Sequence, residues 1–234
     1  VHTVLLPEDP ADFAELVLDM PHFDKLRLTE EDRSKTEQYA ANAARQVRLA
    51  EAGDLTTYLE SLGTRLTIQP ADTANLTRLH QLFSKTNQFN VTTIRYSPSE
   101  IETFIRSPEF VMGIARASDN FGELGIIGTY LLRLADEEAE IDSFVLSCRA
   151  LGRGIEAALC NHVKRLVFES LNKKVLKARF VPTKKNVPAA AFYRDQGFRL
   201  IDENEEDGST YRLECAQFEL MPAPGIEVIT TGER

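Results

Sequence analysis

A glycine-rich turn between a strand pattern and a helix pattern constrains the fold of this chain more than any other feature. Residues 149–154 are Arg-Ala-Leu-Gly-Arg-Gly. The run before them, residues 139–148, is strand-like, and apolar residues recur at helical spacing from Ile155 to about residue 171. A second strand pattern follows at residues 175–181. A strand, a turn, a helix and another strand in this order predict a crossover between two parallel strands.

The segments on either side of this crossover predict a mixed sheet. Strand patterns separated by turn residues precede it, and a helix and two more strands follow it. We expect strands at 65–69, 110–116, 124–134, 139–148, 175–181, 198–201 and 210–220, and helices at 72–83, 97–106, 155–171 and 186–196. This order favours the α/β (α+β) class, with one mixed sheet and helices on both faces. Where the parallel pair begins, the strand ends can splay and leave a slot for a ligand.

The first 62 residues predict a separate, mainly helical segment. Residues 1–6 are strand-like, and three helices follow, the last of them between caps at Asp54 and Gly63. These helices have too few apolar residues to form a stable hydrophobic core of their own. We therefore expect residues 1–62 to be the trailing part of a larger domain, residues 63–220 to form the mixed-sheet domain, and residues 221–234 to be a loose C-terminal tail.

Charge and cysteine usage exclude several classes of function. The chain carries a net charge of -9 over 234 residues, which argues against a nucleic-acid partner. No apolar stretch approaches the roughly 20 residues of a membrane span, and the first residues lack the basic leader of a signal peptide. The three cysteines, Cys148, Cys160 and Cys215, have no ligand spacing, which predicts reduced thiols in a cytoplasmic protein and no metal site.

The charge is unevenly placed along the chain. Residues 149–199 hold 12 Lys and Arg against 3 Asp and Glu. A basic segment in an acidic protein favours a small phosphorylated or acidic partner, although a solvated helix face gives the same count. At its start, Gly152 and Gly154 let the backbone approach a ligand, and the free N–H groups of the next helical turn favour an anion. Arg149 and Arg153 add positive charge there, and a purely structural tight turn is the alternative.

The same glycines satisfy the G-x-G-x-x-A form of the dinucleotide fingerprint, but the context does not fit. That fingerprint belongs on the first strand of a βαβ unit, with an acidic residue about 20 positions later. Here the motif follows several antiparallel strands, and lysines occupy the place of the acid. We therefore exclude dinucleotide binding.

Two motifs resemble those of the GNAT acyltransferase superfamily. Residues 149–154 match its motif A, Arg/Gln-x-x-Gly-x-Gly/Ala, and residues 186–198, Asn-Val-Pro-Ala-Ala-Ala-Phe-Tyr-Arg-Asp-Gln-Gly-Phe, are similar to its motif B. The resemblance implies a GNAT-like fold that binds coenzyme A or the phosphopantetheine arm of a carrier protein, with Tyr193 near the thiol as a general acid. The residues implied to bind this cofactor are Phe144, Leu146, Arg149, Gly152, Arg153, Gly154 and Asn186.

A narrower resemblance covers most of the chain, up to about residue 198. Residues 7–10 (Pro-Glu-Asp-Pro), 85–90 (Lys-Thr-Asn-Gln-Phe-Asn) and 140–149 together resemble the C-terminal half of FkbH-like proteins, of HAD subfamily IIIC. Those proteins join a HAD-type phosphatase domain to a GNAT-like domain, and are associated with loading a glyceryl unit onto an acyl carrier protein in polyketide-type biosynthesis. HAD catalysis needs an Asp-x-Asp pair, which this sequence lacks. We therefore expect no phosphatase activity, and interpret residues 1–62 as the remnant of a missing N-terminal HAD-type domain.

Several other residues are candidates for the chemistry. Cys148 lies beside an arginine and ahead of a helix start, where positive potential favours a thiolate, and the resemblance implies a transient thioester there; a buried apolar role is the alternative. Asp142 and Glu140 share one side of a strand, and one of them could act as a general base through water or serve only solubility. Asn87, Gln88 and Asn90 form a cluster of side-chain amides. Such a cluster suits the recognition of a hydroxylated acyl group; the alternative is that these are helix-cap and turn residues.

The sequence therefore predicts acyl (glyceryl) transfer involving the phosphopantetheine thiol of an acyl carrier protein, with Cys148, Tyr193 and Asp142 as catalytic groups. Core packing is the alternative for Tyr193, and a helix cap for Asn186. Two other functions stay open: an acetyl-CoA-dependent N-acetyltransferase, and a non-catalytic module that docks a carrier protein. In the first interpretation the basic segment holds the prosthetic phosphate and attracts an acidic carrier surface.

Overall fold

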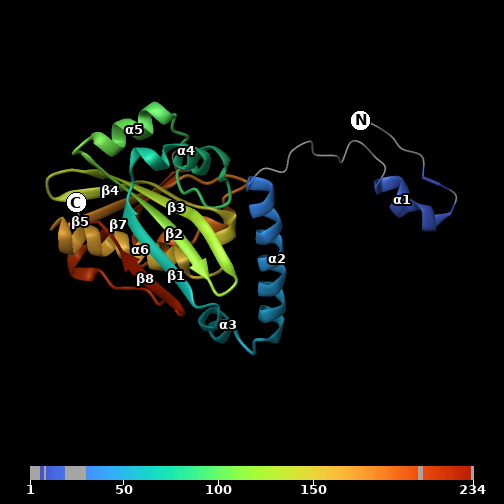
Figure 1. Cartoon of the computed structure of the whole chain (residues 1–234). Helices are drawn as coiled ribbons and strands as arrows, with labels where there is room; N and C mark the ends of the chain where they lie inside the picture. The colour runs from blue at the N-terminus through green and yellow to red at the C-terminus, as the bar shows by residue number, and fades with distance from the viewer. Residues whose placement is uncertain (1–5, 8, 19–29, 205–207, 233–234) are drawn as a thin grey trace. The chain divides into compact units, whose positions relative to one another are not determined.

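The structure is a computed structural model that describes residues 6–7, 9–18, 30–204 and 208–232 (Figure 1). The chain divides into two compact units, residues 1–43 and 44–234. In the first unit, α1 (Phe13–Leu18) follows a 3-10 turn at Pro10–Asp12, which the side chain of Asp9 caps. α2 (Glu30–Glu51) begins in the first unit and ends in the second. The strand expected at residues 1–6 lies, apart from its last residue, outside the described residues.

An eight-stranded mixed sheet forms the centre of the second unit (Figure 1). Its strand order is β6-β7-β5-β4-β3-β2-β1-β8, with β4–β5 and β1–β8 parallel and the other neighbouring pairs antiparallel. The strands are β1 (Thr64–Pro70), β2 (Phe110–Asp119), β3 (Gly122–Leu134), β4 (Glu138–Leu146), β5 (Val175–Phe180), β6 (Arg199–Asn204), β7 (Gly208–Glu214) and β8 (Ile226–Thr230). The expected crossover between two parallel strands is therefore confirmed, and so is the mixed sheet.

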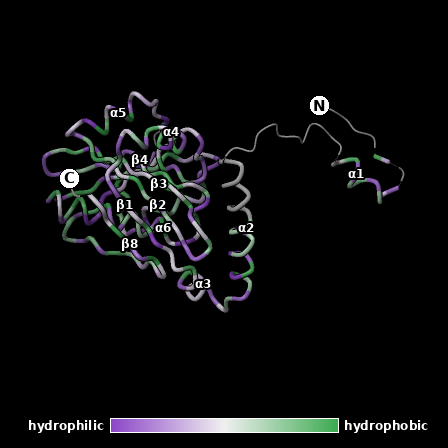
Figure 2. The backbone as a smooth tube through the Cα atoms, in the orientation of Figure 1, coloured by the Kyte–Doolittle hydropathy of each residue, from purple (hydrophilic) through white to green (hydrophobic). Residues whose placement is uncertain are grey.

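Helices cover both faces of this sheet (Figure 1). α4 (Leu76–Lys85) and α5 (Pro98–Arg106) pack over one apolar cluster, and α5 begins at the capping box of Ser97 and Glu100. α6 (Ile155–Arg165), a π-helical turn at Leu166–Ser170 and the short α7 (Phe192–Asp195) pack over the other, larger cluster. Hydrophobic and hydrophilic stretches alternate along most of these elements, as amphipathic elements require (Figure 2). No helix among the described residues has the length and apolar character needed to cross a bilayer.

α3 (Leu55–Leu62) belongs to the sheet unit. It begins at Asp54, whose side chain accepts the N–H of Thr57 at 3.0 Å, and it ends at Gly63 in the left-handed region, as expected. Its buried side chains Tyr58, Leu59 and Leu62 pack with Phe121 after β2. The two compact units divide between residues 43 and 44, so α3, which we expected in the N-terminal segment 1–62, lies in the same unit as the sheet.

The last segment differs from the loose tail expected at residues 221–234. β8 extends the sheet beyond β1, with Thr64 opposite Ile226 at the start of the pairing. Ahead of β8, the side-chain amide of Asn161 on α6 donates to the carbonyl of Met221 at 2.7 Å and accepts its N–H at 2.9 Å. Most side chains of β8 are exposed. The strand is held by backbone pairing, which leaves no alternating apolar signal in the sequence.

A bulge in β4 lies where β4 and β5 stop pairing. The register between β3 and β4 shifts at Asp142, and the last pair between β4 and β5 is Ile141 with Ala178. Before the bulge, Ile141 points into the larger apolar cluster, the one that α6 covers, and after the bulge Phe144 does. A bulge adds one residue to a strand. The side chains of β4 that point into this cluster are therefore odd-numbered before the bulge and even-numbered after it. Beyond the bulge the two parallel strands part, as expected.

Candidate functional site

A cavity of about 480 Å³, which we call the α4 cavity, lies between the end of α4 and the turn after β4. It brings together four residues that the sequence singles out: Asn87, Gln88, Cys148 and Arg149. Its other lining residues are Arg78, Gln81, Leu82, Lys85, Thr86 and Ser147. A larger cavity of about 630 Å³ at the start of β1 contains none of the expected site residues. The α4 cavity is therefore the better candidate for a ligand site.

The α4 cavity is positively charged. Among the described residues, its lining includes the cations Arg78, Lys85 and Arg149 and no carboxylate. The half-buried Arg78 donates from Nε and Nη2 to the carbonyl of Ile126, at 3.1 and 2.8 Å, and from Nη1 to Gln81 at 3.3 Å. Burial, and then the charge of Arg149, lower the pKa of Arg78. A guanidinium that has uncharged acceptors and faces a second guanidinium favours the binding of an anion.

The two walls of the α4 cavity are held by hydrogen bonds. On the α4 side, Arg95 donates to the carbonyls of Phe83 and Ser84 and to Oδ1 of Asn87. On the other side, the hydroxyl of Ser147 accepts the N–H of Arg149 at 3.5 Å. Cys148 lies in this turn and is exposed, so it is not the buried apolar residue considered as its alternative. Its thiol is accessible from the cavity and from solvent.

The gap between the parting strands β4 and β5 is filled by residues 89–91, which we call the inserted segment. The N–H of Val91 donates to the carbonyl of Phe144 at 3.3 Å, and the N–H of Leu146 donates to the carbonyl of Phe89 at 2.9 Å. Just after β5, the N–H of Val181 donates to the carbonyl of Val91 at 2.8 Å. The inserted segment is thus a short antiparallel strand on the free edge of β4.

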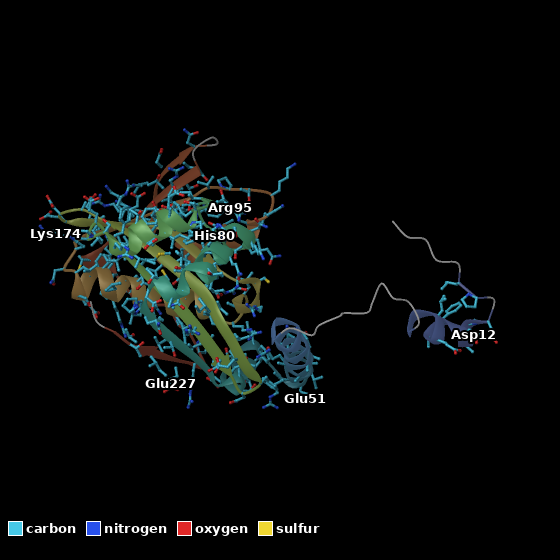
Figure 3. All side chains as sticks on the ribbon, turned by 45° about the horizontal axis from the view of Figure 1, so that its top comes forward. Asp12, Glu51, His80, Arg95, Lys174 and Glu227 are labelled. Carbon is cyan, nitrogen blue, oxygen red and sulfur yellow. The ribbon has the colours of Figure 1, made fainter. Side chains whose placement is uncertain are left out.

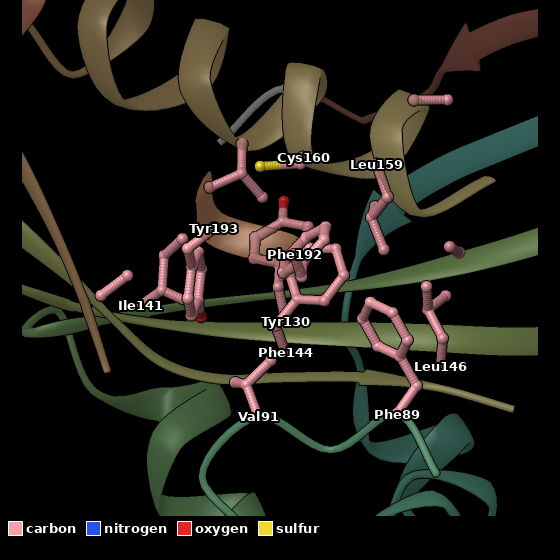
Figure 4. Packing of buried hydrophobic residues seen from close by; sticks show 14 of the residues in the cluster. Phe89, Val91, Tyr130, Ile141, Phe144, Leu146, Leu159, Cys160, Phe192 and Tyr193 are labelled. Atoms are coloured by element: carbon pink, nitrogen blue, oxygen red, sulfur yellow. The ribbon is translucent and has the colours of Figure 1, made fainter. Parts of the chain in front are cut away.

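Phe89 extends from the inserted segment into the core on the α6 face (Figure 4). Its ring centroid lies 5.0 Å from that of Phe192 and 6.2 Å from that of Phe144. Phe144 and Leu146, which we expected beside a pantetheine arm, therefore contact the chain's own side chains. Their backbone groups are also paired with the inserted segment. A pantetheine arm can lie along this part of β4 only if the inserted segment leaves.

Asn186 fastens the inserted segment. Its Nδ2 donates to the carbonyls of Asn90 and Val181, at 3.0 and 2.9 Å. Its Oδ1 accepts the N–H and the hydroxyl of Thr183, at 2.7 and 3.0 Å. These four bonds use the whole hydrogen-bonding capacity of a side-chain amide. This geometry does not support the expected cofactor contact of Asn186, and its side chain does not cap the following helical turn either.

Two buried polar groups near the gap have no hydrogen-bond partner among the described residues: the hydroxyl of Tyr193 and Nδ2 of Asn90. The Tyr193 ring packs against Phe192, Phe198 and Tyr211. Burial raises the pKa of the Tyr193 hydroxyl well above its ordinary value of 10.0. Tyr193 is therefore a core residue that keeps an unused donor. Buried groups without partners need an explanation, and a ligand that supplies the missing hydrogen bonds is one.

The glycine turn leads into α6 as expected, but Arg153 does not face a ligand. Gly152 and Gly154 have φ of 72° and 74°, a region that glycine adopts without strain. Nη1 of Arg153 donates to Asp119 at 3.2 Å, beside Arg45, which binds the same carboxylate through Nε and Nη2 at 2.7 Å. Arg153 is 11% exposed in this pair. The geometry therefore does not support the phosphate contact expected of Arg153, because its guanidinium is buried against Asp119, a carboxylate that it shares with Arg45.

Asp142 lies at the β4 bulge, outside the α4 cavity. Its Oδ1 accepts hydrogen bonds from the hydroxyl of Tyr96 and, at 3.2 Å, from that of Ser143. Burial, and then the bond to Asp142, raise the pKa of Tyr96 well above 10.0. Asp142 lies four residues, about 13 Å of strand, before the end of β4 at Leu146, and Cys148 lies beyond that end, in the turn. The structure therefore does not bring these two expected catalytic groups together.

Arg78 and Lys85 of the α4 cavity, and the pairing of the inserted segment with β4, were not predicted from the sequence. A signal existed for the cations, since Arg78, Gln81 and Lys85 recur at a spacing that places them on one face of α4. Residues 89–91 show no such signal, because their partners are distant in the sequence. The described residues contain no group of three or more His, Cys, Asp or Glu side chains placed to hold a metal ion.

Comparisons with known proteins agree with this fold. The sequence profile described as the acetyltransferase (GNAT) family matches residues 76–198. Among solved structures, spermidine N-acetyltransferase from Vibrio cholerae, in complex with CoA and spermine, superposes with a TM-score of 0.51 at 18% identity, covering 65% of this chain and 96% of that one. A variant of the same enzyme gives a TM-score of 0.50 at 18% identity, covering 64% and 94%. A search among curated proteins gives no match.

Proposed function

The chain belongs to the acetyltransferase (GNAT) family, and from this premise we propose that it transfers an acyl group from a coenzyme A thioester to an amine. The family match favours this N-acetyltransferase alternative over transfer to a carrier protein. The observation that carries the proposal is the parting of β4 and β5 directly ahead of the glycine turn and α6. Such a gap is where an open sheet with a parallel pair binds its ligand.

The groups around this gap match a CoA thioester in their chemistry. A carbonyl at Phe144 and an N–H at Leu146, now paired with the inserted segment, are suited to the amides of a pantetheine arm. The space beside Gly152 is open, and the N–H groups at the start of α6 favour a diphosphate. The unpartnered hydroxyl of Tyr193 offers a donor to the thioester sulfur. Binding then exchanges the inserted segment for the pantetheine arm.

In the proposed reaction, the lone pair of the amine attacks the thioester carbonyl. The C–N bond forms, the C–S bond breaks, and the sulfur leaves as a thiolate. Because the pKa of Tyr193 is raised above that of an ordinary thiol, its hydroxyl stabilises the thiolate as a hydrogen-bond donor rather than by giving up its proton. The proton of the amine leaves through water, for which Asp142 at the bulge is the proposed acceptor.

Calorimetry on the full chain tests the donor. Acetyl-CoA titrated without any other protein should bind with a dissociation constant of about 1 μM to 1 mM, the usual range for enzyme substrates. Release of free thiol in the presence of a panel of amines then measures transfer. The proposal fails if acetyl-CoA gives no heat in this range while a carrier protein bearing phosphopantetheine does.

The filled gap and the positive α4 cavity favour a second candidate, which the FkbH-like resemblance implies. In it, the chain follows a HAD-type domain and either moves a glyceryl unit between Cys148 and the phosphopantetheine thiol of an acyl carrier protein, or docks the carrier without catalysis. Intact-mass measurement after incubation with an acylated carrier tests the transfer. An acyl adduct that persists in Cys215→Ala and is lost in Cys148→Ala supports it, whereas carrier binding without an adduct supports docking alone.

A further inference from the structure

We propose that the α4 cavity binds a small molecule through a phosphate or carboxylate group, and that this molecule is the acyl acceptor. The assignment of this molecule as the acyl acceptor rests on the proposed function, whereas the binding of an anionic group in the α4 cavity does not. An anionic group on the acceptor distinguishes it from a polyamine, because three cations in one cavity repel a polycation.

Among the described residues that line the α4 cavity, no negative charge balances its cations. Arg78 lies partly out of water, and its guanidinium donates to one carbonyl and one amide. Its neighbour Arg149 is also a cation. Holding two guanidinium groups together without an anion costs free energy, which a bound phosphate or carboxylate recovers through charged hydrogen bonds.

Lys85 is the third cation, and the helix end does not account for it. Lys85 lies in the last turn of α4, where a positive side chain offsets the helix dipole. Arg95 already performs this task, because it donates to the carbonyls of Phe83 and Ser84. The exposed ammonium of Lys85 is therefore free to contact a ligand in the cavity.

The remaining lining suits a small polar molecule. The amides of Asn87 and Gln88 and the hydroxyl of Ser147 can donate and accept hydrogen bonds. Arg95 holds Asn87 in place, so this part of the wall is ordered before a ligand arrives. A volume of about 480 Å³ accommodates a small metabolite.

The position of the α4 cavity separates it from the place proposed for the diphosphate of the acyl donor. α4 packs on one face of the sheet and α6 on the other. Gly152 and Gly154, at the start of α6, are not among the lining residues of the α4 cavity. Donor and acceptor would then approach the parting of β4 and β5 from opposite faces of the sheet.

Cys148 provides a reporter for this charge in the full chain. Iodoacetate and iodoacetamide form the same S–C bond with loss of iodide and are similar in size, but only iodoacetate is an anion. Peptide mass spectrometry measures their rates at Cys148 and, as an internal control, at Cys215, which is exposed outside the cavity. The ratio of the two rates reports the local potential.

We expect the iodoacetate-to-iodoacetamide ratio at low salt to be about tenfold higher at Cys148 than at Cys215. Millimolar inorganic phosphate should protect Cys148, and spermidine at equal ionic strength should not. Lys85→Gln and Arg149→Gln should each lower the ratio at Cys148. Lys174→Gln removes an equal charge at a residue that does not line the α4 cavity and lies far from Arg95 (Figure 3), and it should leave the ratio unchanged. Equal ratios at the two cysteines, or equal protection by phosphate and spermidine, would overturn the proposal.

Acetyl-CoA separates this proposal from the proposed function. Undiminished acetyl-CoA affinity in Lys85→Gln, together with lost phosphate protection, supports a distinct acceptor site. If acetyl-CoA itself protects Cys148 and binds Lys85→Gln more weakly, the cavity holds the donor and the proposal is overturned, while acyltransfer stands. If phosphate protects Cys148 and acetyl-CoA does not bind at all, the anion site stands and the proposed function fails.

Discussion

At the scale of single residues, the neighbours of a side chain decide its role more than its place in a motif does. Arg153 and Arg149 belong to one hexapeptide, yet the first is paired with Asp119 and the second lines the α4 cavity. Tyr193 lies where the motif places it, but in a closed core, and its hydroxyl has no hydrogen-bond partner in the part of the chain that the structure describes. A motif therefore predicts the position of these residues, and the contacts determine what they can do.

Tyr193→Phe separates the structural role of this residue from its chemical one. Removing a buried hydroxyl without a partner should leave the free energy of unfolding unchanged or raise it by up to about 1 kcal/mol. Loss of the donor to the leaving sulfur should lower kcat by about 100-fold. Denaturant unfolding and steady-state kinetics measure the two effects. Tyr211→Phe, a change to a neighbouring buried tyrosine, serves as the control, and a variant Tyr193→Phe with full kcat would contradict the role.

His162 makes the stability of the protein depend on pH. Burial, and then Arg165, lower the pKa of His162 from 6.5 to about 4, and its Nε2 lies 3.1 Å from the hydroxyl of Tyr130. Because the unfolded chain binds the proton more readily, the stabilisation is complete above pH 6.5 and is lost as the pH falls towards 4. The loss is about 2–3 kcal/mol. Urea unfolding across this range should show a shallower pH dependence in His162→Gln than in the wild type, and identical slopes would refute the assignment.

At the scale of elements, alternating runs and capping residues predict most of the sheet and its helices. Ser97 and Glu100 form their capping box, and Asp54 and Gly63 bound α3, because these signals act within a few residues of the chain. β8 and the inserted segment could not be predicted in this way. Both form backbone hydrogen bonds with strands distant in the sequence, and such bonds require no particular side chain. The side-chain packing of Phe89 in the core likewise depends on residues distant in the sequence.

For the candidate site, the sequence singled out residues on both walls of the α4 cavity, Asn87 and Gln88 on one and Cys148 and Arg149 on the other, but not its full charge. The turn after β4 carries Cys148 and Arg149 as expected, because a strand followed by glycines localises it. The opposite wall depends on which face of α4 meets that turn, which is a matter of tertiary packing. Arg78 joins the cavity for this reason alone.

Phe89→Ala tests whether the inserted segment competes with the acyl donor. Removing the ring should lower the free energy of unfolding by about 3–5 kcal/mol, the usual cost of such a core cavity. It should also raise the affinity for acetyl-CoA about tenfold, because the closed form then competes less well. Phe83→Ala, a similar loss in the apolar cluster under α4, should destabilise the chain without raising the affinity. Equal affinities in the two variants would show that the inserted segment is not the barrier.

At the scale of the whole sheet unit, one buried carboxylate joins three elements. Asp119 at the end of β2 accepts hydrogen bonds from Arg45 of α2 and from Arg153 ahead of α6, and its own side chain is fully buried. Arg45 also lies over the ring of Phe121, 5.8 Å from its centroid. Elements distant in the sequence are thus joined at one end of the sheet by two guanidinium groups that share one carboxylate.

Asp119→Asn should therefore be costly. It removes a buried carboxylate that two guanidinium groups share, and we expect a loss of about 3–5 kcal/mol in the free energy of unfolding, measured with denaturant. Glu227→Gln breaks a pair of similar chemistry with Arg65, at 3.0 Å, in which both side chains are more than half exposed. That change should cost less than about 1 kcal/mol. Equal losses would mean that burial does not set the strength of the Asp119 cluster.

The inserted segment also has a consequence for the thermodynamics of complex formation. A ligand that enters an open groove removes apolar surface from water, and the heat capacity falls. Here a ligand would expel Phe89 from the core as it enters. The apolar surface that the ligand buries is then offset by the apolar surface of Phe89 that becomes exposed to water. The enthalpy of association with acetyl-CoA should then vary little with temperature. A strongly negative slope of this enthalpy against temperature would show that acetyl-CoA binds elsewhere and that Phe89 stays in the core.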